Sequence, residues 1–127
     1  MIERAVLLEA TRLFNGKLYF ECHDWLEEVW SGTRGEDRDF LQALIHLSVG
    51  LYHLSNGNHQ GASSLLRRAV SGLRRFEPRR DGLEVEPLLS RAERCLEKTN
   101  RALSGEAIEW EVEDIPLMRL SSLDEVQ

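Results

Sequence analysis

The chain has 127 residues, a length that suits one domain with one hydrophobic core and excludes a two-domain enzyme. Hydrophobic residues make up 42% of the sequence and charged residues 30%, a balance typical of a soluble globular protein and not of a collagen or a disulfide-rich scaffold. The 16 Lys and Arg residues stand against 22 Asp and Glu residues, so the net charge of −6 argues against a general nucleic-acid binder.

Two further features bear on the compartment. Cys22 and Cys95 lack the spacing of a metal-binding cysteine pair, and the start of the chain does not resemble a signal peptide. We therefore expect a cytoplasmic protein with free thiols. The most apolar run, residues 40–54, contains Gln42, His46 and His53 and is shorter than the roughly 20 apolar residues of a membrane span. It should be a buried helix, and we expect no membrane partner.

Five segments repeat apolar residues at the helical period of 3.6, and no segment alternates like a strand. They predict helices over residues 3–14, 18–30, 37–54, 59–75 and 87–104. The first ends at Asn15-Gly16, a pair suited to the left-handed helix C-cap, and Pro87 is placed to open the fifth helix at its first turn.

Short loops between these segments favour antiparallel neighbours. The sequence thus predicts an all-α, single-domain helical bundle of about five helices, built from antiparallel helix hairpins over residues 1–104. Residues 105–127 form an acidic C-terminal tail, and we expect part of it to dock through Trp110, Ile115 and Leu117.

On the second predicted helix, His23 and Glu27 lie one turn apart at the shoulder of the apolar face. Phe20 and Trp30 flank the pair, and Asp24 falls on the side expected to face solvent. One interpretation is an ordinary surface pair that adds ~0.3–0.5 kcal/mol to the helix. A second is metal binding, because an imidazole and a carboxylate on adjacent turns can both reach one divalent cation.

The third predicted helix is apolar over most of its circumference and should be central, but a narrow strip carries Gln42, His46 and His53. In an antiparallel hairpin with the second helix, Gln42 and His46 each lie within about half a turn of the level of His23. His53 should lie about 13 Å farther along the axis, near the turn that follows the first helix. A third metal ligand would come from His46, Gln42, Asp24 or another subunit.

The stretch FNGKLYFECHDWLEEVW, followed by R-x-F-L-Q-A-L-I and by GLYHLSNGN-x-x-GA-x-x-LL, resembles the uncharacterised helical family called domain of unknown function 309. The resemblance covers about residues 13–89. The H-x-x-x-E-x-x-W/Y motif of that family corresponds here to His23, Glu27 and Trp30. It implies a metal-binding role for this motif without a defined activity. The sequence has His46 where the L-I-Q segment of the family has Gln.

Together these observations lead us to expect a divalent metal ion, of unspecified identity, held by His23, Glu27 and His46. The residues expected to complete the motif or line the site are Trp30, Arg38, Gln42 and His53.

Two other uses of the same residues stay open. Glu27 could fix the tautomer of His23 and leave the other ring nitrogen to act as a general base or to bind a small ligand. The residues could also form a buried polar network in a structural or protein-interaction module. No nucleophile elbow, phosphate-binding loop or dinucleotide motif indicates an enzyme class.

Residues 67–80 contain six arginines and one carboxylate, and Arg67 and Arg74 lie seven residues apart on one helix face, as do Arg68 and Arg75. A phosphate-rich partner could use this stripe, but no aromatic residues are interleaved with it, so we expect a solvated face and no nucleic-acid partner. The tail could neutralise the stripe within the chain or in a neighbouring copy. A small ligand, a protein and a second copy of the chain are the partners that we expect.

Overall fold

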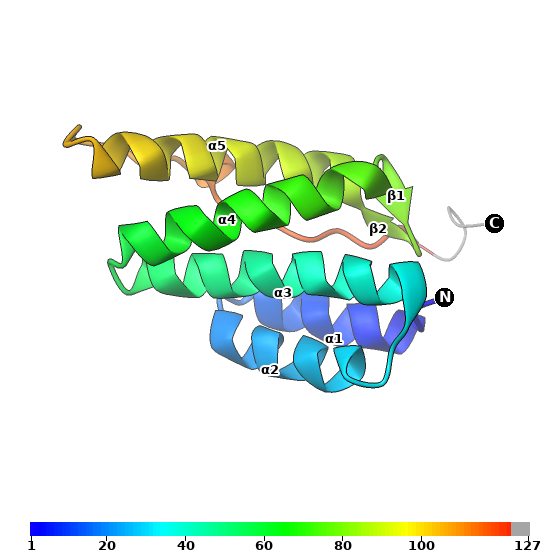
Figure 1. The fold of residues 1–127 in the computed structure, drawn as a ribbon. Helices are drawn as coiled ribbons and strands as arrows, with labels where there is room; N and C mark the ends of the chain where they lie inside the picture. Colours follow the sequence, from blue (N-terminus) through cyan, green and yellow to red (C-terminus); the bar gives the residue numbers. More distant parts are fainter. Residues whose placement is uncertain (123–127) are drawn as a thin grey trace.

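The computed structural model of the chain describes residues 1–122 and shows an all-α bundle, which confirms the predicted fold class. Within these residues the helices are α1 (Arg4–Asn15), α2 (Tyr19–Trp30), α3 (Gly35–Ser55), α4 (His59–Leu73) and α5 (Val85–Leu103). Single 3-10 turns lie at Arg74–Phe76 and Val112–Asp114. Each α-helix packs on the next along the chain, and α3 lies in the middle of the row, as predicted (Figure 1). None of the described helices is long and apolar enough to cross a membrane.

Two observed helices begin earlier than the apolar period predicts, although neither N-cap side chain donates or accepts a capping hydrogen bond. Helix α3 begins two residues before the predicted start, and Glu36 and Asp37 lie in its first turn, where negative charge favours the helix dipole. Helix α5 begins at Val85, so that Pro87 occupies the first turn, whose N–H groups have no partner within the helix. Both helices therefore carry an acidic residue in the first turn, ahead of the residues from which they were predicted.

A short β-hairpin that was not among the predicted elements joins α4 to α5. Its strands are β1 (Arg79–Arg80) and β2 (Leu83–Glu84), paired antiparallel with Arg80 opposite Leu83. The two turn residues, Asp81 and Gly82, have φ angles of 51° and 87°. Positive φ at both positions is typical of the type I′ turn, for which Asp-Gly is a favoured pair. Strands of two residues are too short to show alternating apolar and polar residues. The Asp81-Gly82 dipeptide is therefore the feature of the sequence that indicates the hairpin.

Two glycines allow α3 and α4 to pack closely. A Cβ atom at Gly50 would lie 3.1 Å from Cγ of Leu66, and one at Gly72 would lie 3.0 Å from Cβ of Ala43. Because both distances are shorter than ordinary van der Waals contacts, larger side chains at these positions would push the helices apart. The contact places the side chains of α3 and α4 on either side of a narrow groove.

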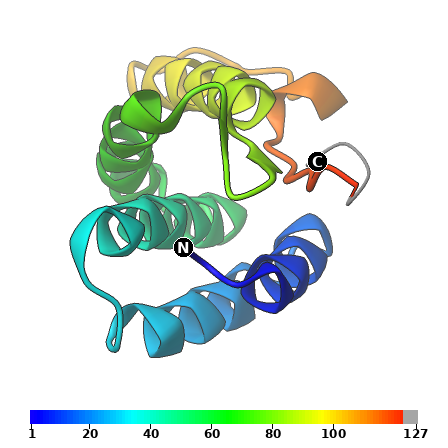
Figure 2. The same cartoon turned by 90° about the vertical axis from the view of Figure 1, so that its right-hand side faces the viewer.

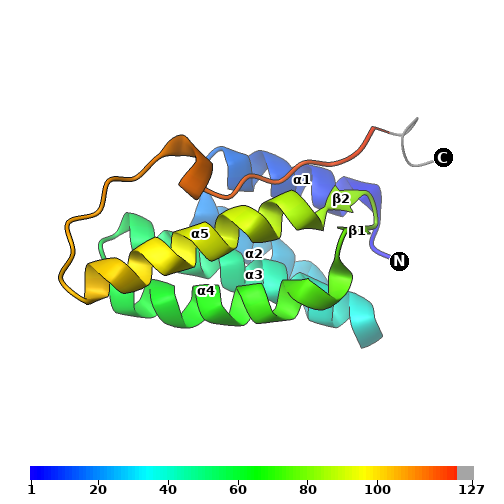
Figure 3. The same cartoon turned by 90° about the horizontal axis from the view of Figure 1, so that it is seen from above.

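After α5 the chain turns back and runs between α5 and α1, which Figures 2 and 3 show from two directions. The side-chain amide of Asn15 donates to the backbone carbonyl of Met118 and accepts from its backbone N–H, both at 2.8 Å. Met118 is buried, whereas Trp110 and Leu117 are 38% and 45% exposed. Trp110 and Ile115 line a pocket together with Tyr19 and Leu51 of the bundle, so apolar contacts and the hydrogen bonds of Asn15 both hold the segment. Residues 123–127 of the predicted tail lie outside the described residues.

Half of the arginine stripe, Arg74 and Arg75, is neutralised by carboxylates of neighbouring helices and not by the part of the tail up to residue 122. Arg75 lies 3.3 Å from Asp39 of α3, and Arg74 lies 3.3 Å from Glu93 of α5. Within residues 105–122, the tail carboxylates that form ion pairs are Asp114 and Glu106, and their partners belong to α5. The charge counts identify a basic segment and an acidic segment, but they do not predict which residues those segments contact in the fold.

Candidate metal and ligand site

Helix α2 presents His23, Asp24 and Glu27 beside its buried face. The helix buries Tyr19 and Cys22, among others, which turns the shoulder with His23 toward the edge of α3. The side chain of His23 is 22% exposed, whereas those of Asp24 and Glu27 are 61% and 52% exposed. The group therefore has one half-covered nitrogen ligand and two solvated carboxylates.

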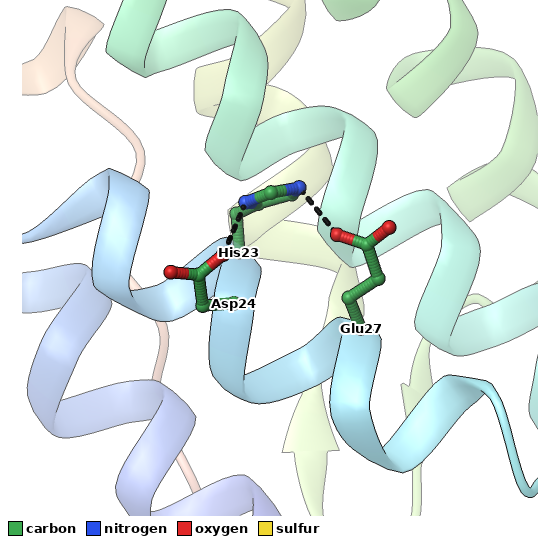
Figure 4. Close-up of side chains that lie close together, drawn as sticks. All are labelled: His23, Asp24 and Glu27. Carbon is green, nitrogen blue, oxygen red and sulfur yellow. Dashed lines mark ion pairs between the residues drawn. The ribbon is translucent and has the colours of Figure 1, made fainter.

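The imidazole ring of His23 lies between the two carboxylates, which approach it from opposite edges (Figure 4). Its Nε2 atom is 2.6 Å from Oε2 of Glu27, and its Nδ1 atom is 3.3 Å from Oδ1 of Asp24. Nδ1 is buried and has no hydrogen-bond partner, so the contact with Asp24 is electrostatic. One ligand atom from each of the three residues lies within 4.8 Å of those from the other two.

Asp24, and not a residue of α3, joins His23 and Glu27 in this group. His46 is outside the group that the described residues form, and it lines a groove with Gln42, Arg67 and Arg68 on the side of α4. The position of His46 along the sequence predicts its level along α3. It does not predict which neighbouring helix the side chain faces. Helix α3 packs against both α2 and α4. Gln42 and His46 therefore line the groove beside α4, whereas His53 lines the pocket beside α2.

His53 shares a pocket with His23, although the two residues lie on different helices. The two histidines line one pocket of about 190 Å³, whose other walls are Phe20, Val49 and Tyr52. The ring centroids of Phe20 and Tyr52 are 5.4 Å apart, and those of Phe20 and His23 are 5.6 Å apart. These large rings fill the axial distance between the histidines. The Nδ1 atom of His53 lies 3.4 Å from the side-chain amide nitrogen of Asn58, and not at the turn that follows α1.

Trp30 and Arg38 form a separate arrangement at the end of α2. The guanidinium carbon of Arg38 lies 3.6 Å from the centroid of the Trp30 ring, a cation–π contact. Arg38 also donates hydrogen bonds to the carbonyl oxygens of Trp30 and Thr33, at 3.1 Å and 3.2 Å. A cation at these carbonyls stabilises a helix C-terminus. The tryptophan of the motif thus packs in the α2–α3 connection and not against the carboxylates.

The cysteines are poor candidates for ligands or nucleophiles. Both are free and buried, as expected for thiols. Burial raises the pKa of Cys22 to about 11, although Ser48 donates a hydrogen bond to its sulfur at 3.4 Å. Burial likewise raises the pKa of Cys95 to about 12. Since the thiolate is the form that binds metals and attacks electrophiles, neither cysteine supplies that chemistry near neutral pH.

Comparisons with known proteins agree with the motif. The model of the family described as "Domain of unknown function (DUF309)" matches residues 7–65, which include His23, Glu27 and Trp30. This match confirms the resemblance, although it ends before residue 89. The "Uncharacterized protein YpuF" of Bacillus subtilis (strain 168) is 38% identical over 53 residues. That alignment covers 41% of this chain and 30% of the relative. The name of the relative assigns no activity to it.

Proposed function

We propose that the group formed by His23, Asp24 and Glu27 binds a divalent metal ion. The observation that carries the proposal is the mutual distance of at most 4.8 Å between one ligand atom from each residue. Imidazole nitrogen and carboxylate oxygen are ligands of zinc, manganese, nickel and iron(II). The exposure of both carboxylates leaves room for water to complete the coordination sphere.

The geometry favours different roles for the two carboxylates. Nε2 of His23 faces Glu27 at the exposed edge of the ring, so these two residues would be the direct ligands. Metal–ligand distances of roughly 2 Å require the two ligand atoms to separate to about 3 Å when an ion enters. Asp24 lies 3.3 Å from Nδ1 and would orient the ring once its side chain turns to accept a hydrogen bond there, as carboxylates behind metal-binding histidines do. The ion requires neutral imidazole, so binding weakens in acid.

Thermal unfolding with and without added ions tests the proposal. A bound ion stabilises the folded state alone, so the wild-type unfolding midpoint should rise with ion concentration. Glu27→Gln and His23→Ala should abolish this rise. Glu28→Gln is the matched control because Glu28 is exposed on the same helix but lies outside the group, and its response should equal that of the wild type. If zinc, manganese, nickel and iron(II) all leave the wild-type midpoint unchanged, metal binding is excluded.

The pocket beside His23 favours a second candidate, a metal-free site for a small ligand. Its volume of about 190 Å³ suits only a fragment-sized molecule, and its walls are mostly aromatic. The contact of Glu27 with Nε2 would fix the tautomer of His23. Phenol, added as a probe without metal, should shift the NMR signals of Tyr52 and His23 in a saturable manner. Unchanged signals would exclude this use.

The remaining alternative is a purely structural pair. In that case His23→Ala should lose about 1 kcal/mol of stability in the absence of metal, because it removes a largely covered ring that packs beside Phe20. Neither ions nor phenol should then bind. The unfolding experiment therefore separates this alternative from both binding functions.

A further inference from the structure

We infer that the groove between α3 and α4 binds a small phosphate ester, at a site separate from the His23 group. The groove has a volume of about 490 Å³, within the range of roughly 300–1,000 Å³ that small-molecule sites occupy. None of its lining residues belongs to the group formed by His23, Asp24 and Glu27. The inference therefore does not depend on the proposed metal function.

The charge of the groove favours an anion. Helix α4 contributes Arg67 and Arg68 to its lining and the 3-10 turn after it contributes Arg75, whereas Asp39 is the one carboxylate among the lining residues. Arg75 lies 3.3 Å from Asp39 and already neutralises it. Within residues 1–122, Arg67 donates a hydrogen bond to Ser63 at 3.4 Å, and Arg68 takes part in no hydrogen bond or ion pair. Arg68 thus has its full set of guanidinium donors available, a geometry that matches phosphate oxygens.

The floor of the groove suits the organic part of an ester. Its lining includes Ala43 and Gly72, which lie where the two helices touch, and neither carries a side chain beyond Cβ. Their close contact brings the two helices together and leaves a small apolar surface below the arginines. The phosphate would lie against the α4 rim, and the organic group would lie over this surface. A bare phosphate ion would leave the floor uncovered.

His46 lines the same groove on the side formed by α3, so its pKa is sensitive to charges in the groove. Burial, and then the nearby charge of Arg68, lower the pKa of this histidine. The charged groups that line the groove around it are Arg67 and Arg68 on α4, Arg75 in the 3-10 turn after α4, and Asp39 on its own helix. A bound phosphate counters the positive field, so it should raise the pKa of His46.

A small molecule fits these features better than a nucleic acid. None of the groove-lining residues is a Phe, Tyr or Trp on which a base could stack. Glu36 and Asp39 lie beside Arg75 and would repel an extended phosphate backbone. The positive region that remains is local, around Arg67 and Arg68.

Calorimetric titration with phenyl phosphate tests the inference, with EDTA present so that no metal occupies the His23 group. Wild-type protein should bind saturably, and Arg68→Gln should weaken the affinity by about tenfold or more, as expected for a lost charge-assisted hydrogen bond. Arg74→Gln makes the same charge change directly after α4, but Arg74 lies outside the groove and pairs with Glu93, so this variant should bind like the wild type. His23→Ala should also bind like the wild type, and NMR should show a raised pKa of His46 in the complex.

Several results would overturn the inference. The absence of saturable binding at millimolar phenyl phosphate would do so, as would equal weakening by Arg68→Gln and Arg74→Gln, which would indicate a general charge effect. Inorganic phosphate that binds as tightly as phenyl phosphate would contradict the assignment of an ester. A short RNA that binds more tightly through the same arginines would assign the groove to nucleic acid.

Discussion

Two polar clusters of the molecule differ in burial and therefore in what they can do. The side chain of Asp114 is fully buried and contacts two basic residues of α5, Arg94 and Lys98. The carboxylates of Asp24 and Glu27 are 61% and 52% exposed and share one histidine. The Asp114 cluster joins the C-terminal segment to the bundle, whereas the His23 group joins residues of a single helix.

The pKa of Asp114 shows how strongly the buried cluster is tied to the fold. Burial by itself would raise this pKa, but hydrogen bonds from Lys98, the backbone N–H of Glu111 and Arg94 outweigh it and lower the pKa to about 2. A buried carboxylate with these partners cannot exchange them without a large loss of stability. Exposed carboxylates exchange partners at little loss, so the His23 group is the better place for an ion to enter.

The largest expected effect is the destabilisation caused by Asp114→Asn. The variant removes the charge that Lys98 and Arg94 contact, and we expect a loss of about 2 kcal/mol in the free energy of unfolding. Urea denaturation at neutral pH measures it. The exposed neighbour Glu113 provides a control, since Glu113→Gln should change stability by less than about 0.5 kcal/mol. Equal effects of the two variants would show that burial does not distinguish them.

The same carboxylate should also control stability in acid. Its pKa is lower in the folded state than the ordinary value of 3.8, so its stabilisation is present above that value and is lost as the pH falls from 3.8 toward about 2. Wild-type stability should decline over this interval more steeply than that of Asp114→Asn. Parallel pH profiles of the two proteins would contradict this role of Asp114.

An intermediate effect is expected for Arg38→Ala, which removes the cation above Trp30 and two hydrogen bonds to carbonyl oxygens. We expect a loss of about 1 kcal/mol in the free energy of unfolding. The response of the midpoint to metal ions should be unchanged, because Arg38 does not belong to the His23 group. A variant that keeps its stability but loses the metal response would place Trp30 and Arg38 in the site.

The smallest effect is expected for Glu27→Gln in the absence of metal. An exposed i, i+4 pair contributes about 0.5 kcal/mol or less, so chemical denaturation should barely distinguish this variant from the wild type. The comparison with Asp114→Asn is direct because each substitution converts one carboxylate to an amide. A loss as large as that of Asp114→Asn would make the His23 group structural.

The helices could be predicted because their apolar stripes recur at short range along the chain. The docking of the C-terminal segment could not, since it depends on contacts such as Asn15 with Met118, which lie 103 residues apart. The acidic composition of the tail suggested the arginine stripe as its partner, but hydrogen bonds and burial select α5 and α1 instead. The composition of the C-terminal segment predicts its charge, whereas contacts between residues far apart in the sequence determine where the segment lies.

The candidate site was predictable to the extent that its residues share one helix. His23 and Glu27 are one turn apart, and the periodicity alone puts them together. Asp24 lies about 100° around the helix from His23. His23 contacts both carboxylates because its two ring nitrogens lie on different edges of the imidazole ring. Across helices, the axial level of His46 was not sufficient to place its side chain, because α3 packs against two neighbours and His46 lines the groove beside α4.

The most direct test of the account is the metal content of the protein purified without a histidine tag or chelator, then dialysed against each candidate ion. We expect about one ion per wild-type chain for at least one metal, little for Glu27→Gln and the wild-type amount for Glu28→Gln. Wild-type protein that takes up none of the four ions, or equal loading of Glu27→Gln and wild type, would contradict the assignment of metal binding to His23 and Glu27.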